Sequence, residues 1–377
     1  MHWKQGGLIF METETYPVKI KTMTPIHIGS GNDYGPSEYV NSRAKLKGVP
    51  VDIIKRIDVA RYYMDLDENK KERFLSNLTN PRFKLEDVDK KINKKFTRYN
   101  AVNKIKKPLD GDVKEHIKTS GKMYIPGSSL KGAIRTAIFY NIVDEDDFSD
   151  FAGDIIINKN GKIKIDKRNY QNWIDGYFSS RGRNAAQKSI MKFFQVADSS
   201  TSNLAYIYEI KAIMANENNR SQFYSRNGSV VKSYYETIAK ETDLKSNFTI
   251  QKDEKILSRL DLLDKSDILD IDFIKKSIYD FSQDLISYEL DFARRYKISY
   301  LEKFYENLEN DPDKPLLRVG AGSGLMATSI AMKVKEYDYN AFDLIRDTFR
   351  RAYEFEFPKS RKITQTGSPL SWVQLEF

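Results

Sequence analysis

Strand-type and helix-type patterns follow one another irregularly along this chain, and their order is what most limits its fold. Residues 16–28 (YPVKIKTMTPIHI) alternate apolar and polar side chains with a period of two, which is typical of a half-buried strand. Strand patterns return in the middle and at the C-terminal SWVQLEF. Helical patterns separate them without the regular alternation that builds a parallel sheet. The sequence therefore predicts an α+β fold whose antiparallel sheets carry helices on one face.

The strands in the middle of the chain are expected to pair with their neighbours in sequence. Residues 192–200 (KFFQVADSS) and 204–214 (LAYIYEIKAIM) flank a short polar connection, which favours an antiparallel pair. A second pair is expected between 234–242 (YYETIAKET) and 246–252 (SNFTIQK). In contrast, charged stretches with helical apolar spacing predict helical insertions at about 51–120 and 144–190.

The composition excludes several kinds of chemistry. The 377 residues include no Cys and only 3 His, so disulfides, zinc-thiolate sites, iron-sulfur clusters and thiol nucleophiles are excluded. We expect no cofactor and no metal. The 62 Lys and Arg against 53 Asp and Glu give a net charge of +9, which permits a polyanionic partner without demanding one. No apolar run reaches the about 18 residues of a membrane span, so we expect a cytoplasmic protein.

The most informative stretch is residues 122–143, KMYIPGSSLKGAIRTAIFYNIV. It predicts a short strand, a turn at Pro126-Gly127, and a helix that begins with Ser128 or Ser129 as its N-cap. Amides at the helix N-terminus, together with Lys131 and Arg135 one turn apart, would favour a phosphate. The alternative is an ordinary capped helix with a solvated basic edge. A phosphate-binding loop of the nucleotide-hydrolase type is not present, because no Gly-Lys-Ser/Thr ends the motif.

Two glycine-rich segments indicate close approach of another backbone. Gly29-Ser30-Gly31 follows the first strand, and Arg318-Val319-Gly320-Ala321-Gly322-Ser323-Gly324 lies between a strand and a helix. Either a ligand phosphate or a neighbouring segment would account for them. A third interpretation of the second segment is a dinucleotide-binding enzyme, but the spacing of its glycines does not match that motif.

His27, just before the first of these loops, is compatible with three roles. It could be the general base of a metal-free ribonuclease, a contact to an RNA phosphate or base, or a structural side chain. The carboxylates Asp33, Glu38 and Asp198 lack a metal-binding spacing. Basic residues interleaved with aromatic ones at 90–99, 177–193 and 294–297 suit single-stranded nucleic acid, although core aromatics and solvated cations explain them equally well.

Five of these segments together resemble the CRISPR RAMP superfamily. The matching pieces are PVKIKTMTPIHIGSG, YIPGSSLKGAIRTAI, FFQVADSS, RVGAGSG and the terminal PLSWVQLEF, in that order. Within the superfamily, the chain resembles the subunit at the terminal position of the type III-A Csm effector complex. Of these pieces, PGSSLKGAIRTA is the most specific.

The resemblance implies two RRM-like (ferredoxin-like) modules with charged helical insertions. Residues 1–10 have no assigned role, residues 11–250 form the first module with its insertions, and residues 251–377 form a helical segment and the second module. The implied partners are the guide RNA (crRNA), the other RAMP subunits of the Csm complex and host maturation nucleases. The residues implied to bind RNA are His27, Gly29, Ser30, Gly31, Ser128, Ser129, Lys131, Arg135, Arg318, Gly320, Gly322, Ser323 and Gly324.

One departure from the superfamily affects the expected activity. The backbone subunit that cuts target RNA carries a catalytic Asp in a stretch resembling GGIDNP, whereas residues 32–48 here read NDYGPSEYVNSRAKLKG. We therefore expect a non-catalytic subunit that binds the 3′ part of the guide RNA, caps the complex and takes part in guide maturation. The alternative is a metal-independent RAMP endoribonuclease that processes precursor crRNA with His27 as general base.

Overall fold

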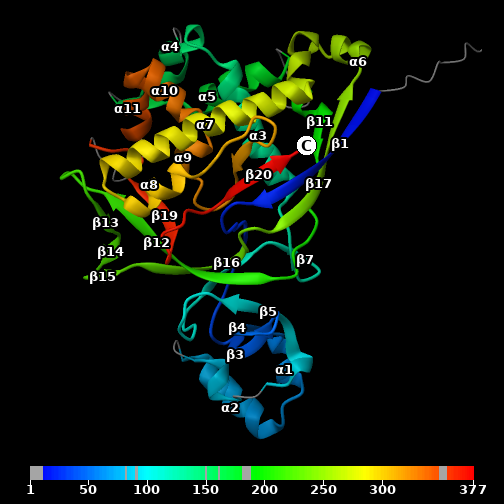
Figure 1. Ribbon diagram of the computed structural model, residues 1–377, viewed down its shortest axis with the longest axis vertical. Helices are drawn as coiled ribbons and strands as arrows, with labels where there is room; N and C mark the ends of the chain where they lie inside the picture. Colours follow the sequence, from blue (N-terminus) through cyan, green and yellow to red (C-terminus); the bar gives the residue numbers. More distant parts are fainter. Residues whose placement is uncertain are drawn as a thin grey trace, which may run out of the picture.

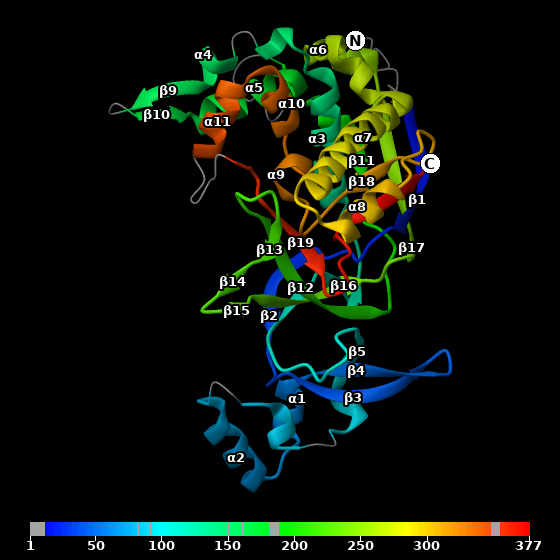
Figure 2. The same cartoon turned by 60° about the vertical axis from the view of Figure 1, so that its left-hand side comes forward.

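A computed structural model describes residues 12–80, 83–89, 92–148, 151–159, 162–180, 188–347 and 355–377. Helices form the upper part of the molecule in Figure 1, two sheets cross its middle, and a small lobe with α1 (Val59–Met64) and α2 (Glu68–Leu78) lies at the bottom. Figure 2 shows the same three levels from another side.

The first sheet has five strands, and every neighbouring pair in it is antiparallel. Its order is β11 (Phe194–Val196), β17 (Asp243–Lys252), β1 (Glu12–Thr22), β20 (Trp372–Glu376) and β18 (Leu316–Arg318). Alternate residues along the strands point inward, where α3 (Gly127–Ile142) and the long α7 (Ile271–Arg295) cover this face (Figure 1).

The second sheet has nine strands and lies below the first. Its main path is β2 (Gly29–Tyr34), β6 (Val113–His116), β16 (Lys232–Ile238), β12 (Ala205–Ala215), β5 (Thr97–Asn103), β4 (Val49–Ile57) and β3 (Tyr39–Leu46). Two further strands, β13 (Ser221–Phe223) and β19 (Ser360–Thr364), extend β12. The β12–β5 and β16–β6 pairs are parallel and the others are antiparallel.

The remaining elements are short. Three small hairpins are β7 (Lys118–Thr119) with β8 (Lys122–Met123), β9 (Ile156–Lys159) with β10 (Lys162–Ile165), and β14 (Ser225–Arg226) with β15 (Ser229–Val230). The other α-helices are α4 (Phe151–Ile155), α5 (Lys167–Phe178), α6 (Glu254–Arg259), α8 (Ser299–Glu306), α9 (Gly324–Ala327), α10 (Ala331–Tyr337) and α11 (Tyr339–Asp347). Short 3-10 helices lie at Leu85–Asp87, Lys94–Phe96, Asp146–Phe148, Ile190–Phe193 and Leu263–Leu269.

Most buried apolar side chains form one continuous core between the sheets and the helices. The lower lobe has a separate small core made by Val40, Ile57, Tyr62, Phe74, Phe83, Leu85, Ile92 and Phe96. Because a separate core holds its own elements together, this lobe is a distinct packing unit attached to the edge of the nine-stranded sheet.

The predicted α+β class with antiparallel sheets is confirmed, but the predicted pairing of sequence neighbours is wrong. β11 pairs with β17, and β12 pairs with β16. The serine-rich connection after β11 runs along β17, because the Ala197 amide bonds to the Asn247 carbonyl and the Ser200 amide to the Lys245 carbonyl. This connection therefore carries the chain from one sheet to the other instead of closing a hairpin.

The helical insertion expected at about 51–120 is also partly wrong, because β4, β5 and β6 lie within it. The residues Ile53, Ile54 and Ile57 have helical spacing, yet all three are buried in β4. Ile54 belongs to the main core and Ile57 to the separate core of the lower lobe, so both faces of β4 are covered and its apolar residues need not alternate.

The first strand is shorter than expected. β1 ends at Thr22, and Gly29–Gly31 begins β2 instead of forming a loop, with a register irregularity between Gly29 and Asp33. β1 pairs with β17 on one side and with β20 on the other, so strands from both expected modules share one sheet. The module division near residue 250 stays a prediction. In the described part of the chain, no helix combines the length and hydropathy that a membrane crossing requires.

Candidate functional site

Three of the predicted segments meet at two buried histidines. The Ala321 amide of the C-terminal glycine-rich loop donates to the His27 carbonyl at 2.8 Å. The His27 ring lies 5.9 Å from the ring of His116, which pairs in register with Gly29. The His116 side chain in turn contacts Tyr124, just before the PGSSLKG helix α3. We call this cluster, together with Glu236 and Lys118, the histidine junction.

His116 ties the first glycine segment to the start of α3. Its Nδ1 accepts from the Ile28 amide at 3.1 Å, so its Nε2 carries the proton and donates to the Tyr124 carbonyl at 3.0 Å. Burial lowers the pKa of His116 to about 3, which keeps the ring neutral. Sequence reasoning missed this residue, because a lone His within a stretch read as an insertion carries no local signal.

His27 is only 3% exposed, and it is held from two sides. Its Nδ1 donates to the Glu236 carbonyl at 2.6 Å, and its ring lies 4.6 Å from that of Tyr235. Burial lowers the pKa of His27 to about 4. A neutral, covered imidazole of this kind positions the turn around it, and its side chain is not presented to a ligand.

A buried carboxylate completes the histidine junction. The Glu236 side chain accepts from the His116 amide at 3.1 Å and from the ammonium of Lys118. Burial raises the pKa of Glu236 above its usual range, against the opposing charge of Lys118. Lys118 also bonds to Glu115, at 3.3 Å, so it has a second carboxylate partner.

A second buried cluster lies beneath the glycine-rich loop, and we call it the arginine cluster. Arg318 donates to Glu289 at 3.1 Å and to the Gly322 carbonyl at 3.0 Å. Arg361 donates to the other oxygen of Glu289 at 2.6 Å. Although burial alone would raise the pKa of Glu289, the charges of Arg361 and Arg318 lower it below its usual range. Arg318 is 3% exposed, so its side chain fixes the loop from within.

The glycines of this loop are required by its geometry. Gly320 has φ +99°, and a Cβ on it would lie 2.5 Å from the His27 carbonyl oxygen. Gly322 and Gly324 also have positive φ, but a Cβ on Gly324 would meet nothing within 4 Å. The loop is therefore pressed against the histidine junction at Gly320 and open at Gly324.

The predicted serine N-cap of α3 is wrong. The helix begins at Gly127 after Pro126, without a side-chain cap from its own first turn. Instead, the Gly127 amide donates to the Asp198 carboxylate at 2.8 Å. A Cβ on Gly127 would lie 2.0 Å from the Val196 carbonyl oxygen, so the helix start is packed directly on the end of β11. Asp198 takes the place at the helix N-terminus where a phosphate was expected.

The two predicted cations of α3 differ. Arg135 pairs with Asp175 at 3.3 Å and lies over the Phe178 ring, so it anchors α5. Lys131 has no hydrogen bond or ion pair to any described residue, and burial lowers its pKa. Of the two cations, Lys131 is the one left to meet an anion.

The predicted residues thus divide into an exposed set and a buried set. The exposed ones are Gly29, Ser30, Gly31, Ser128, Gly320 and Gly324. The half-buried ones are Ser129, Lys131, Arg135 and Gly322, and the buried ones are His27, Arg318 and Ser323. The outer surface of the site is therefore made largely of backbone and small side chains, with charged and aromatic support behind it.

The predicted basic patches add little to the candidate RNA-binding site. Lys90, Lys91 and residues 181–187 lie outside the described residues. In the third patch, Arg294 pairs with Glu302 and Glu306, and Arg295 pairs with Glu356. The described part of the chain holds no group of three or more acidic or histidine side chains arranged for a metal ion.

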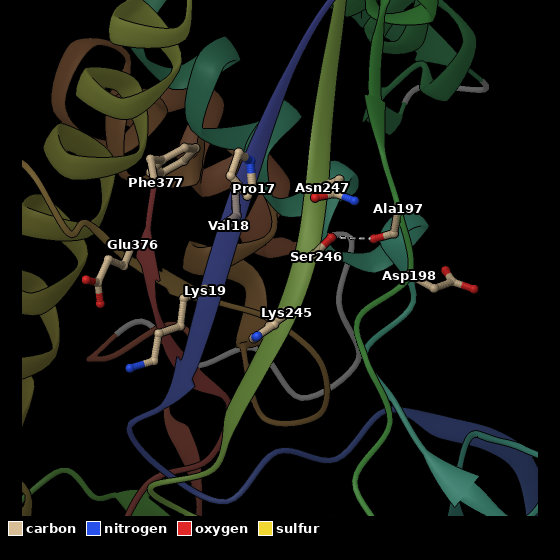
Figure 3. Close-up of a pocket in the computed structure, with 10 residues that line it drawn as sticks. All are labelled: Pro17, Val18, Lys19, Ala197, Asp198, Lys245, Ser246, Asn247, Glu376 and Phe377. Carbon is tan, nitrogen blue, oxygen red and sulfur yellow. Dashed lines mark hydrogen bonds between the residues drawn. The ribbon is translucent and has the colours of Figure 1, made fainter.

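A groove of about 580 Å³ crosses the outer face of the five-stranded sheet (Figure 3). Its charges are mixed, because Lys19 lies opposite Lys245 on one side and opposite Glu376 on the other. Asp243 pairs with Lys19 at 3.1 Å. Mixed charge of this kind gives the groove little preference for a polyanion.

Comparisons with known proteins agree with this architecture. The family model of the RAMP superfamily matches residues 19–323. The chain is 27% identical to the "CRISPR system Cms protein Csm5" of Methanocaldococcus jannaschii, over 86% of this chain and 75% of that protein.

Two solved structures are similar in fold. One is a chain in the cryo-EM structure of a Csm–crRNA–target RNA ternary complex of a type III-A CRISPR-Cas system, with TM-score 0.66 and 22% identity over 95% of this chain and 99% of that chain. The other is the crystal structure of T. onnurineus Csm5, with TM-score 0.60 and 19% identity over 94% of this chain and 99% of that chain.

The fold is thus that of an α+β protein built from ferredoxin-like sheets, with glycine-rich segments gathered at one junction. The family match spans most of the chain. This chain belongs to the RAMP superfamily.

Proposed function

We propose that this chain is a guide-RNA-binding, non-catalytic subunit of a type III-A CRISPR interference complex. In this role it caps the complex at the 3′ part of the crRNA and takes part in guide maturation during antiviral defence. The similarity to a Csm protein over most of both chains supports the assignment to such a complex. The similar fold of a chain from a Csm complex with crRNA and target RNA supports it further.

The observation that carries the RNA-binding proposal is the meeting of three segments at the histidine junction. Gly29–Gly31, the loop Gly320–Gly324 and the start of α3 present exposed glycine and serine backbone. A surface without bulky side chains lets a sugar-phosphate backbone approach closely, and amides can donate to its oxygens. Lys131 supplies a cation that has no partner among the residues that the structure describes.

The buried state of His27 favours binding over cleavage. A general base must lie within hydrogen-bond reach of the proton that it removes. The Nδ1–H bond to the Glu236 carbonyl leaves Nε2 as the basic nitrogen, but the His27 side chain is only 3% exposed, so this nitrogen is covered by the fold. We therefore assign His27 and Arg318 to positioning the RNA-binding surface, and we assign direct contacts to the exposed glycines, the serines and Lys131.

The proposed partners follow from the same assignment. They are crRNA, the neighbouring RAMP subunits of the Csm complex and host nucleases that trim the guide. The proposed location is the cytoplasm, where such a complex would meet foreign transcripts.

Salt-dependent RNA binding by the purified full chain tests this function. We expect the affinity for single-stranded guide RNA to fall with salt, and Lys131→Gln to reduce the slope of log K against log salt by about 0.7. Lys255→Gln, at an exposed position on α6, is the matched control and should leave the slope unchanged. A slope that Lys131→Gln leaves unaltered would remove this residue from the site.

Incubation with precursor crRNA in EDTA separates the proposal from the endoribonuclease alternative. We expect bound RNA to stay intact. Specific cuts that His27→Ala abolishes would overturn the non-catalytic assignment.

A further inference from the structure

The outer face of β12 carries two tyrosines that the site described above does not use. Tyr206 and Tyr208 are two residues apart on this central strand, so they share a face. Both are half-exposed, whereas Ala205 and Ile207 between and beside them are buried in the main core. Neither phenol hydroxyl makes a hydrogen bond to any residue that the structure describes.

Cations flank the two tyrosines at both ends. The Lys104 ammonium lies 5.0 Å from the centre of the Tyr206 ring, and the described residues offer it no carboxylate. At the other end, Lys362 on β19 donates to the Tyr235 hydroxyl at 2.9 Å, and Tyr235 pairs in register with Tyr208. Both lysines are exposed. Lys106 and Lys107 continue the positive charge beyond Lys104 in the turn after β5.

This row of side chains leads to the glycine-rich loop. Tyr208 and Ala321 pack on the small apolar cluster of Ile210, Tyr235 and Leu370. A Cβ on Gly322 would lie 3.4 Å from Leu370. Tyr208 and the glycine-rich loop therefore pack on the same small cluster, which places the two tyrosines beside the proposed RNA-binding surface.

We infer that Tyr206 and Tyr208 form a base-stacking strip for single-stranded RNA that leaves the glycine-rich loop, with Lys362 and Lys104 taking its phosphates. This inference rests on the proposed function and deepens it. Flat rings with nearby cations are what unstacked bases and their phosphates require. Residues two apart on a strand are separated by about 7 Å, twice the about 3.4 Å rise between stacked nucleotides. Each tyrosine therefore takes a separate, splayed base.

The lysine over Tyr206 does not block this role. A base that stacks on an aromatic ring gains more than an exposed cation–π contact does. The flexible Lys104 side chain can therefore leave the ring and reach the adjacent phosphate. Among the described residues that line the groove on the five-stranded sheet there is no comparable pair, because the outward positions are Pro17, Lys19, Lys245 and Asn247 and the single aromatic ring, that of Phe377, packs against Phe248 (Figure 3).

The test compares two probes, an oligouridine and an abasic ribose-phosphate oligomer of the same length, on the full chain. Wild type should prefer oligouridine. Tyr206→Leu with Tyr208→Leu should lose about tenfold or more of the oligouridine affinity and keep the abasic affinity. The double Tyr→Phe variant keeps the rings and should bind both probes as wild type does. Tyr339→Leu, an exposed tyrosine on α11, is the matched control and should have no effect.

Tyr208 packs on the cluster that contains Leu370, so the double variant could be less stable. If it melts at a lower temperature than wild type, the binding test is made with the single variant Tyr206→Leu. Oligouridine binding that is unchanged in folded leucine variants overturns the strip and leaves the proposed function standing. Unchanged RNA affinity with lost assembly into the Csm complex assigns the surface to a protein partner and also overturns it. If wild type binds neither probe, the proposed function and the strip both fail.

Discussion

The histidine junction and the arginine cluster each contain one buried glutamate, and the two glutamates differ in charge balance. Glu236 has one cation, Lys118, and neutral histidines beside it, and its pKa is raised by burial. Glu289 has two arginines, and its pKa is lowered by them. A buried carboxylate is thus held as an anion where two guanidinium groups offset its desolvation, and less firmly where a single amine does.

The two clusters also support different segments of the candidate site. The arginine cluster joins α7, β18 and β19 through permanent charges and fixes the glycine-rich loop at Gly322. The histidine junction holds the Gly29–Gly31 segment and the start of α3 through groups that must stay neutral. One support is therefore insensitive to mild acid, while the other depends on pH.

Replacing Glu289 should have the largest effect on stability, because its charge offsets that of two buried arginines. Glu289→Gln leaves two buried arginines without a counter-charge, so we expect the free energy of unfolding to fall by about 3–5 kcal/mol. Urea unfolding at neutral pH measures this change. Glu302→Gln removes a half-exposed partner of Arg294 and should cost below about 1 kcal/mol. Equal costs at the two positions would show that the cluster is not a buried ion pair in solution.

Acid should weaken the histidine junction before it weakens the arginine cluster. The folded-state pKa of His27 is about 4, below the ordinary 6.5. At a pH between these two values, His27 is therefore protonated in the unfolded chain and neutral in the folded chain. The stability from neutral His27 is complete above about pH 6.5 and is lost as pH falls toward about 4. We expect a loss on the order of 3 kcal/mol from this residue.

Unfolding by urea between about pH 7 and about pH 4.5 measures the effect. His27→Phe keeps a ring beside Tyr235 and cannot take up a proton, so its stability should fall less steeply with acid. A wild-type curve as flat as that of the variant would mean that His27 is accessible to protons in the folded chain.

Part of this arrangement was predictable from sequence. Alternation and the PGSSLKG motif predicted β1, α3 and the α+β class, and the glycines correctly indicated close backbone approach. The partners of these segments were not predictable, because they are remote in sequence. His116 lies 120 positions from Glu236, and Glu289 lies 72 positions from Arg361. A local sequence pattern does not indicate contacts between residues this far apart in the chain.

The charged residues of the motifs show the same limit. The resemblance to the RAMP superfamily implies RNA contacts for Arg318 and Arg135, yet both have carboxylate partners in the fold. A cation in a motif is assigned to a ligand correctly only when its protein partners are known. Lys131 has none among the described residues, which is why the proposed site keeps it.

Gly320 lies between the two clusters. Substituting it tests whether the glycine-rich loop presses on the histidine junction. A side chain there is strained by the positive φ and also meets the His27 carbonyl at 2.5 Å, so Gly320→Ala should cost about 2–3 kcal/mol of stability. Gly324→Ala carries the strain without the clash and should cost about 1 kcal/mol. Urea unfolding of the two variants gives the difference. Similar costs would mean that the loop does not press on the histidine junction.

The smallest expected effect is that of Glu236→Gln, and it separates the two glutamates most directly. The new amide oxygen can still accept from the His116 amide, and Lys118 keeps Glu115 at 3.3 Å and the His116 carbonyl at 3.2 Å. The new amide nitrogen takes the place of Oε1, which has no hydrogen-bond partner among the described residues, so the number of unpaired buried groups does not rise, and we expect a change below about 1 kcal/mol in urea unfolding. Because the pKa of Glu236 is raised in the fold, wild type loses stability relative to this variant as pH rises. A cost as large as that of Glu289→Gln would show that Glu236 is also an obligatory anion, and the two supports would then work by the same principle.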